Sequence, residues 1–178
     1  IVWIASGMVY FRVLVEIGAV APSFLSIAAG PIAIMLGVFA IGAAIMWNSA
    51  MAPDQSPLEP NNPSELKPAV LFAALYAAVL FAVAAAQDLL GDAGLFAAAA
   101  VSGLTDMDAI TLSTSQLVSR QLVDSDTGWR VILVASMSNI LFKFGLAASL
   151  GSRAMSRRLG ALFTAAIAVG AALIVFWP

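Results

Sequence analysis

Apolar stretches long enough to cross a bilayer constrain this chain more than any other feature. A spanning helix needs about 20 mostly apolar residues, and the segments that meet this length are 1–20, 24–47, 68–90, 93–118, 127–150 and 159–177. Hydrophobic residues make up 62% of the chain and charged residues only 10%, whereas soluble domains carry roughly 25% charged residues. The expected fold class is therefore all-α, a polytopic transmembrane helical bundle of about six spans.

A polar segment over residues 48–67 divides the chain into three predicted parts. Its prolines, which forbid a regular helix, are Pro53, Pro57, Pro60 and Pro63. Residues 1–47 are predicted to hold two transmembrane helices, 48–67 a Pro-rich polar loop, and 68–178 a four-helix transmembrane unit. The chain begins inside an apolar run at Ile1, so we expect it to be a fragment of a longer protein.

An internal sequence similarity relates the first two predicted helices to the last two. A shift of 130 residues, with a one-residue slip at one pair, aligns Ala5-Ser6 with Ala135-Ser136, Arg12 with Lys143 and Trp47 with Trp177. The identities are few, so chance is the alternative. If the repeat is real, it runs parallel and its first two helices lie upstream of Ile1, in keeping with the duplications common in transporters.

The distribution of arginine predicts an orientation. Arg153, Arg157 and Arg158 lie between the last two predicted spans, in a segment without acidic residues. Cytoplasmic loops carry an excess of Lys and Arg. This turn is therefore predicted to be cytoplasmic, and the loop 48–67 to lie on the opposite side.

The fourth predicted span carries two carboxylates near its middle, Asp106 and Asp108. An ionised group at that depth costs about 2.5–3.5 kcal/mol on insertion scales, so such groups usually have a partner or a task. On a regular helix the two side chains would point about 200° apart. Either two polar seams face two neighbouring helices, or the helix is broken near Gly103 and exposes backbone carbonyls, as at the ion sites of transporters.

Polar residues on two other helices are the expected partners of these aspartates. Ser136, Asn139 and Lys143 recur at i, i+3 and i+7 and form one stripe on the fifth span. Lys143 is expected to neutralise an aspartate, either as a static pair or by exchanging with a cation. Arg12 and Glu16 are four residues apart and are predicted to pair along the first helix.

The absence of Cys and His narrows the chemistry of a site. Disulfides, thiol catalysis and the usual zinc ligands are excluded, so a bound cation would be held by oxygen. Asp106 and Asp108 are the expected metal ligands, with a divalent cation such as magnesium as the candidate. The candidates for ion binding or coupling are Asp106, Asp108, Thr105, Thr111, Asn139 and Lys143, with Arg12, Glu16, Ser102 and Ser136 as secondary candidates.

Several strings in the sequence resemble a known family. They are NPSELKPA at 62–69, GDAGL at 91–95, SGLTDMDAITLS at 102–113, and Ser138-Asn139 followed by Lys143. Together they resemble the C-terminal domain of unknown function attached to MgtC/SapB-type bacterial membrane proteins, closely over 62–178 and loosely over 1–47. The resemblance implies a multi-pass protein of the bacterial inner membrane and suggests magnesium or another cation. In that family a related Thr-Leu-Ser string also precedes the first helix seen here, and this chain lacks it.

Three functions compete on these observations. The first is a transporter or channel for a hard cation, which is magnesium-like, sodium or proton-coupled. The second is a non-transporting membrane subunit that scaffolds or regulates a partner, a homo-oligomer or another membrane protein, with its polar seams joining helices. An intramembrane aspartyl hydrolase is the third, but two aspartates on one short string are poorly placed to face each other. We therefore expect no enzyme, and the scattered Lys and Arg predict no nucleic-acid partner.

Overall fold

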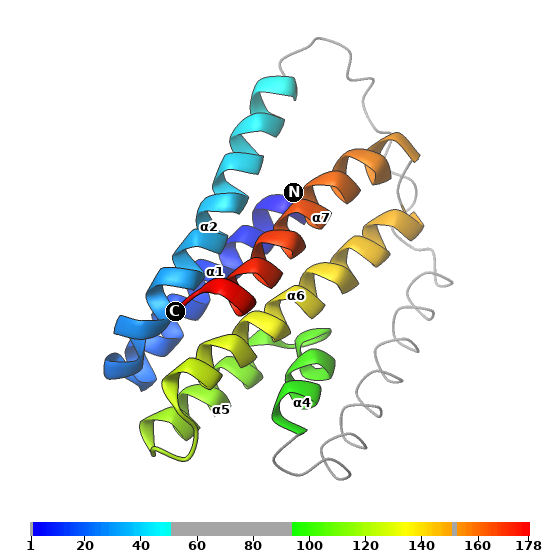
Figure 1. The fold of residues 1–178 in the computed structure, drawn as a ribbon. Helices are drawn as coiled ribbons and strands as arrows, with labels where there is room; N and C mark the ends of the chain where they lie inside the picture. The colour runs from blue at the N-terminus through cyan, green and yellow to red at the C-terminus, as the bar shows by residue number, and fades with distance from the viewer. Residues whose placement is uncertain (1, 51–93, 151–152) are drawn as a thin grey trace.

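The computed structural model describes residues 2–50, 94–150 and 153–178, and these ranges form a helical bundle without a strand (Figure 1). The helices are α1 (Val2–Val20), α2 (Pro22–Ala50), α4 (Gly94–Gly103), α5 (Met107–Ser119), α6 (Ser125–Leu150) and α7 (Arg153–Phe176). Among them α1, α2, α6 and α7 contain segments long and apolar enough to cross a membrane. The predicted all-α transmembrane bundle is confirmed, and the chain is an integral membrane protein.

Four of the predicted spans correspond to single helices in the structure. The first, second, fifth and sixth spans are α1, α2, α6 and α7, although α2 continues to Ala50 and α7 already begins at Arg153. Residues 48–50, which were assigned to the polar loop, are therefore helical. The rest of that loop and the third predicted span, 68–90, lie outside the described residues.

Aromatic packing joins α1, α2 and α7. Trp3 stacks on Phe39 with ring centroids 4.3 Å apart and lies 5.2 Å from Phe163. The Trp3 indole N–H also donates a 2.7 Å hydrogen bond to the Phe39 carbonyl. This close approach requires glycine at position 42, because a Cβ there would lie 2.6 Å from Cε2 of Trp3.

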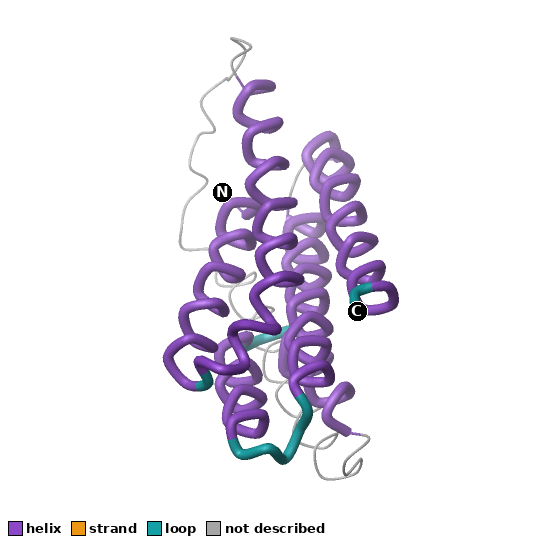
Figure 2. Tube along the Cα trace, turned by 60° about the vertical axis from the view of Figure 1, so that its left-hand side comes forward, coloured by secondary structure: helices purple, strands orange, loops and turns teal. Residues whose placement is uncertain are grey.

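The fourth predicted span is not a span but a hairpin of two short helices. At 1.5 Å per residue, α4 and α5 are about 15 and 20 Å long, and neither crosses a hydrocarbon core of about 30 Å. In Figure 1, α4 rises from the lower end of the bundle and α5 returns to it. Figure 2 shows the loop between them inside the bundle, whereas the loop between α5 and α6 lies at the lower end. We call residues 94–119 the re-entrant hairpin.

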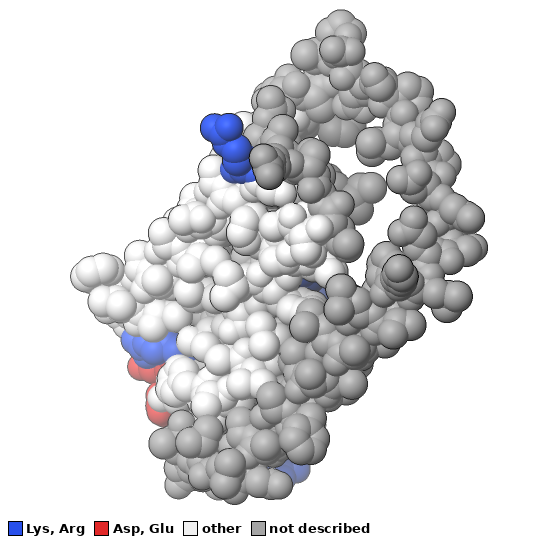
Figure 3. Space-filling view, turned by 90° about the vertical axis from the view of Figure 1, so that its right-hand side faces the viewer, with Lys and Arg blue, Asp and Glu red and all other residues white. Residues whose placement is uncertain are grey.

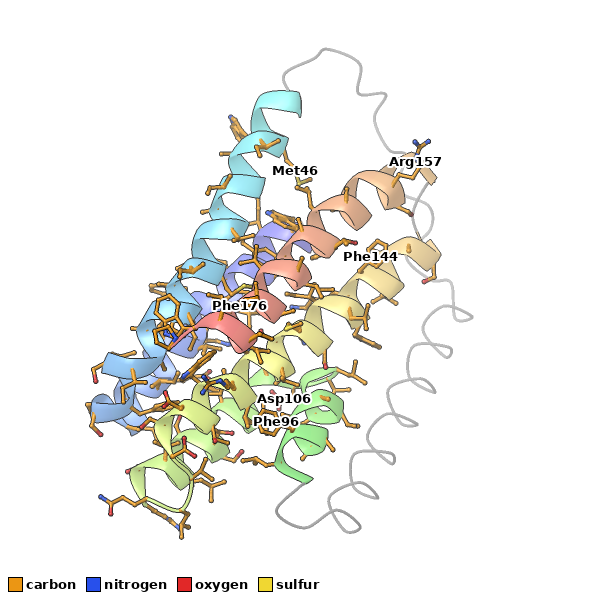
Figure 4. All side chains as sticks on the ribbon, viewed as in Figure 1. Met46, Phe96, Asp106, Phe144, Arg157 and Phe176 are labelled. Atoms are coloured by element: carbon orange, nitrogen blue, oxygen red, sulfur yellow. The ribbon has the colours of Figure 1, made fainter. Side chains whose placement is uncertain are left out.

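The hairpin changes the predicted topology. α2 and α7 run antiparallel, since Gly30 packs against Trp177 and Gly170 against Met35. The C-terminal end of α2 therefore lies level with the start of α7, and Figure 4 shows Met46 and Arg157 toward the same end. The sequence predicted that the segment with Arg153, Arg157 and Arg158 and the loop 48–67 lie on opposite sides of the membrane. This prediction is wrong for residues 48–50, because the hairpin replaces one crossing.

The direction of the helices also corrects the predicted repeat. In Figure 1, α1 descends and α6 rises, so the two helices run in opposite directions. Residues 2–50 and 125–176 are thus not related by a parallel repeat. Any common ancestry of these two helix pairs would give an inverted repeat, a form in which transporters also occur.

Several charged groups lie toward the ends of the bundle. On the face shown in Figure 3, most of the blue and red atoms lie toward the two ends, and the described surface between them is white apart from one blue patch. At the lower end Asp124 accepts a 2.8 Å hydrogen bond from the Thr127 N–H. This bond lowers the pKa of Asp124 and caps the start of α6. Arg130 donates to the carbonyls of Ile174 and Trp177, both at 3.3 Å, and so holds the end of α7.

Labelling of single cysteines should test this topology, because the natural chain has none. Trp47→Cys and Arg157→Cys replace exposed residues at one end of the bundle, and Gln121→Cys replaces one in the α5–α6 loop at the other. In oriented vesicles, an impermeant maleimide should label Trp47→Cys and Arg157→Cys from the same side and Gln121→Cys from the opposite side. Labelling of Trp47→Cys and Arg157→Cys from opposite sides would restore six full spans.

Candidate functional site

The tip of the re-entrant hairpin is a broken helix, the second of the two alternatives predicted for this segment. α4 ends at Gly103 and α5 begins at Met107. Asp106 caps α5, with its carboxylate accepting hydrogen bonds from the N–H of Asp108 at 2.9 Å and of Ala109 at 3.3 Å. The Thr105 hydroxyl donates to the Ser102 carbonyl at 3.2 Å. The predicted candidates Ser102, Thr105 and Asp106 therefore shape the tip.

Helix α6 holds this tip at mid-depth in the bundle. The Asn139 side chain donates a 2.9 Å hydrogen bond to the Gly103 carbonyl. Gly103 itself lies so close to α6 that an added Cβ would be 2.6 Å from the Cα of Ala135. Ala135 and Asn139 lie near the middle of α6, a membrane-crossing helix. The break in the hairpin therefore lies near the middle of the membrane.

A cluster of three charged side chains lies beside the tip, between α1 and α5. Arg12 forms an ion pair with Asp108 and another with Glu16, the latter at 3.6 Å. The pairing of Arg12 with Glu16, predicted from their spacing, is confirmed. Because α5 doubles back and packs against α1, Asp108 meets Arg12.

The structure does not pair Lys143 with either aspartate. In the described part of the chain the ion-pair partner of Asp108 is Arg12, while Lys143 is half-buried on α6. Asp106 is exposed, contrary to the expectation that both aspartates would be enclosed by protein. Its carboxylate is directed to the first turn of α5, which keeps it from facing Lys143.

Ser136 joins α6 to α1 rather than to the hairpin. Its hydroxyl accepts a 3.1 Å hydrogen bond from the Tyr10 hydroxyl and donates one of 2.7 Å to the Leu133 carbonyl. Both side chains are buried. Ser136 and Asn139 thus share a stripe on α6, as predicted, but they contact different helices.

The charged cluster opens on the outer face of α1. The side chains of Arg12, Asp108 and Glu16 are 55%, 37% and 16% exposed. Arg12 lies on a groove of about 370 Å³ whose other lining residues are Ala5, Met8, Val9, Phe11 and Val15. Charged groups near the bilayer centre normally face a protein interior or a water-filled cavity. This opening is therefore expected to meet water or another protein surface rather than lipid tails.

Two polar residues that are not among the predicted site candidates lie farther along α5. Thr114 and Ser115 are completely buried, as is the predicted candidate Thr111, and the hydroxyls of all three have no hydrogen-bond partner in the structure. Their spacing of i, i+3 and i+4 was a usable signal, since residues so spaced share a helix face. No group of three or more acidic side chains suited to a metal ion occurs in the ranges that the structure describes.

Comparisons with known proteins give a family but no activity. A family model described as a domain of unknown function, DUF4010, matches residues 1–151. An uncharacterized protein of Aquifex aeolicus (strain VF5) is 35% identical over 92 residues, which are 52% of this chain. The matched part spans only 40% of that relative's length. No solved structure matches the chain.

Proposed function

This chain belongs to the DUF4010 family, whose description assigns no activity, and we propose that it carries a hard cation across a membrane through a site beside the tip of the re-entrant hairpin. The supporting observation is the meeting of Asp108, Glu16 and Arg12 at the point where the fourth segment is broken. Transporters commonly place their ion sites at such interrupted helices near the bilayer midplane. The proposed role is transport rather than enzyme catalysis.

The chemistry of the cluster suits a cation that exchanges with an internal positive charge. Carboxylate oxygens of Asp108 and Glu16 are ligands for hard cations. Arg12 already occupies the same carboxylates, so an incoming cation must compete with its guanidinium. Ion entry would therefore displace Arg12, which gives the site two states. The sequence analysis had assigned this exchange with a cation to Lys143, and the structure gives Arg12 as the charge that pairs with Asp108.

Three classes of cation are candidates for the cargo. A magnesium-like divalent ion is suggested by the resemblance to MgtC/SapB-type proteins, as is the assignment to the bacterial inner membrane. Sodium and the proton also suit a site of carboxylates and hydroxyls. Asp106 and Asp108 remain the proposed ligands of a divalent ion, although Asp106 already caps α5.

A membrane subunit that binds a partner is the second candidate function, and the outer face of α1 favours it. Exposed large apolar side chains follow this helix and line the groove that ends at Arg12, among them Met8, Phe11 and Val15. A partner helix with an acidic residue at mid-depth would cover this face and pair with Arg12. The polar residues of the hairpin would then serve only to join helices.

Flux measurements on the full-length protein in proteoliposomes should decide between the two functions. We expect the wild type to carry magnesium, sodium or protons above the protein-free background. Asp108→Asn and Glu16→Gln should each lower the rate about tenfold or more, a factor that corresponds to the loss of one interaction worth ~1.4 kcal/mol. Ser113→Ala is the matched control, because Ser113 is an exposed α5 residue whose hydroxyl donates to the Ile110 carbonyl.

Two results would contradict a transport role. One is a wild-type flux equal to that of protein-free liposomes for all three ions. The other is a flux that Asp108→Asn and Glu16→Gln leave unchanged. In either case the partner-binding function becomes the better account of the charged cluster.

A further inference from the structure

Unpartnered buried oxygen atoms concentrate in one region of the described structure. The buried side-chain atoms without a hydrogen-bond partner are Glu16 Oε2, Asp108 Oδ1, Thr111 Oγ1, Thr114 Oγ1 and Ser115 Oγ. All of them belong to α5 or to the part of α1 that pairs with it, and Asp108 Oδ1 also forms the ion pair with Arg12. Buried polar atoms are almost always paired, so a cluster of exceptions requires an explanation.

The three α5 hydroxyls differ from other hydroxyls of the bundle. A Ser or Thr in an apolar helix commonly donates to a carbonyl of its own preceding turn. The serines that do so here are Ser6, Ser26, Ser113, Ser136 and Ser149. Thr111, Thr114 and Ser115 do not, although each is completely buried. Their oxygen lone pairs and protons therefore remain available to a ligand.

Helix geometry brings one of these oxygens, that of Thr111, close to the carboxylates. Thr111 follows Asp108 by three residues, so the two side chains are neighbours on one face of α5. α1 and α5 run in the same direction (Figure 1), and Arg12 pairs with Asp108. Glu16, one turn beyond Arg12, therefore lies level with the turn of α5 from Thr111 to Ser115.

We propose that Glu16, Asp108 and the hydroxyl of Thr111 bind one dehydrated monovalent cation of the sodium class. The inference rests on the proposed function and names its cargo. The net charge of the cluster determines the valence of the cation that it binds. Glu16, Asp108 and Arg12 together carry two negative charges and one positive charge. A single monovalent cation neutralises the remaining negative charge, whereas a divalent ion leaves an uncompensated charge in a medium of low dielectric constant.

Thermal unfolding of the full-length protein in detergent tests the site, with sodium chloride replacing choline chloride at constant ionic strength. Ligands that bind only the folded state stabilise it by RT ln(1 + [L]/Kd), so the Tm of the wild type should rise specifically with sodium and continue to rise with the logarithm of its concentration above Kd. Thr111→Val should weaken the apparent sodium affinity about tenfold, which corresponds to the loss of one good ligand. Ser113→Ala should match the wild type.

The substitutions are chosen so that loss of binding differs from loss of folding. Valine replaces an unpartnered buried hydroxyl with a methyl group of the same shape, a change that is close to neutral for folding. Thr111→Val should therefore have a sodium-free Tm equal to or above that of the wild type. A purely structural role for Thr111 would leave the sodium response of this variant unchanged, and that result would overturn the proposal.

The remaining outcomes separate this inference from the transport function. Absence of a sodium response, together with a cation flux that Asp108→Asn abolishes, would refute the sodium site and leave transport standing. Absence of both the response and any flux would refute both. A Tm response to magnesium that requires Asp108 but not Thr111 would assign a divalent cargo and overturn the monovalent one.

Discussion

Gly103→Ala is expected to destabilise the protein by about 3 kcal/mol, the upper part of the range for forcing extra volume into a packed site. The new Cβ would lie 2.6 Å from the Cα of Ala135, and a helix backbone cannot rotate away as a side chain can. Separation of the hairpin from α6 would also break the hydrogen bond from Asn139 to the Gly103 carbonyl. Equilibrium unfolding in detergent, with denaturant or heat, measures the effect.

Gly145→Ala is the matched control for this substitution. Gly145 lies in α6, and a Cβ added there meets no atom within 4 Å. Alanine favours a helix over glycine by about 1 kcal/mol, so this variant should be as stable as the wild type or more stable. Equal stabilities of the two alanine variants would contradict the close contact between the hairpin tip and α6.

The second large effect is expected for the pair of Arg12 and Asp108. Asp108→Asn should cost about 2 kcal/mol, below the 3–5 kcal/mol typical of a fully buried pair, because Arg12 is 55% exposed and keeps Glu16 as a partner. Arg12→Gln should cost more, since it leaves the carboxylates of Glu16 and Asp108 side by side without a cation. Both losses follow from an unbalanced charge, not from lost packing.

The double variant should recover much of this loss. Removal of both charges leaves Glu16 alone beside neutral groups, so the stability of Arg12→Gln/Asp108→Asn should exceed the additive expectation by about 1–3 kcal/mol, the usual coupling of residues in contact. A double-mutant cycle from thermal or denaturant unfolding gives this coupling. Strict additivity would mean that the ion pair contributes nothing to the folded state.

Hydropathy predicted α1, α2, α6 and α7 because each is apolar over a full bilayer thickness. It failed for residues 93–118, because two half-helices that fold back have the same summed hydropathy as one crossing helix. The polar string from Ser102 to Asp106 marked the place of the break but not the direction of the chain after it. Only the path of α5 decides whether a crossing is lost, and that path depends on packing against α1 and α6.

The contacts of the site residues were likewise predictable from the sequence only in part. The pair of Arg12 and Glu16 was predictable, because an i, i+4 spacing on one helix fixes the contact locally. The partner of Asp108 was not, because reversal of α5 after the tip brings Asp108 to Arg12 on α1 and away from Lys143. Asn139 was identified as a candidate, but its contact with the Gly103 carbonyl exists only once the helix is broken there.

The re-entrant hairpin also bears on how the chain is inserted during synthesis. The insertion machinery selects apolar windows of about 20 residues, and residues 94–119 offer such a window before they fold. Insertion of this window as a full crossing would place α6 and α7 in the bilayer upside down. Positive charges late in a chain can reverse such a topology, and the first turns of α7 carry Arg153, Arg157 and Arg158. We expect these arginines to act as a late orientation signal, one that retains the start of α7 on one side of the membrane and favours the return of the segment before α6 to the side from which it entered.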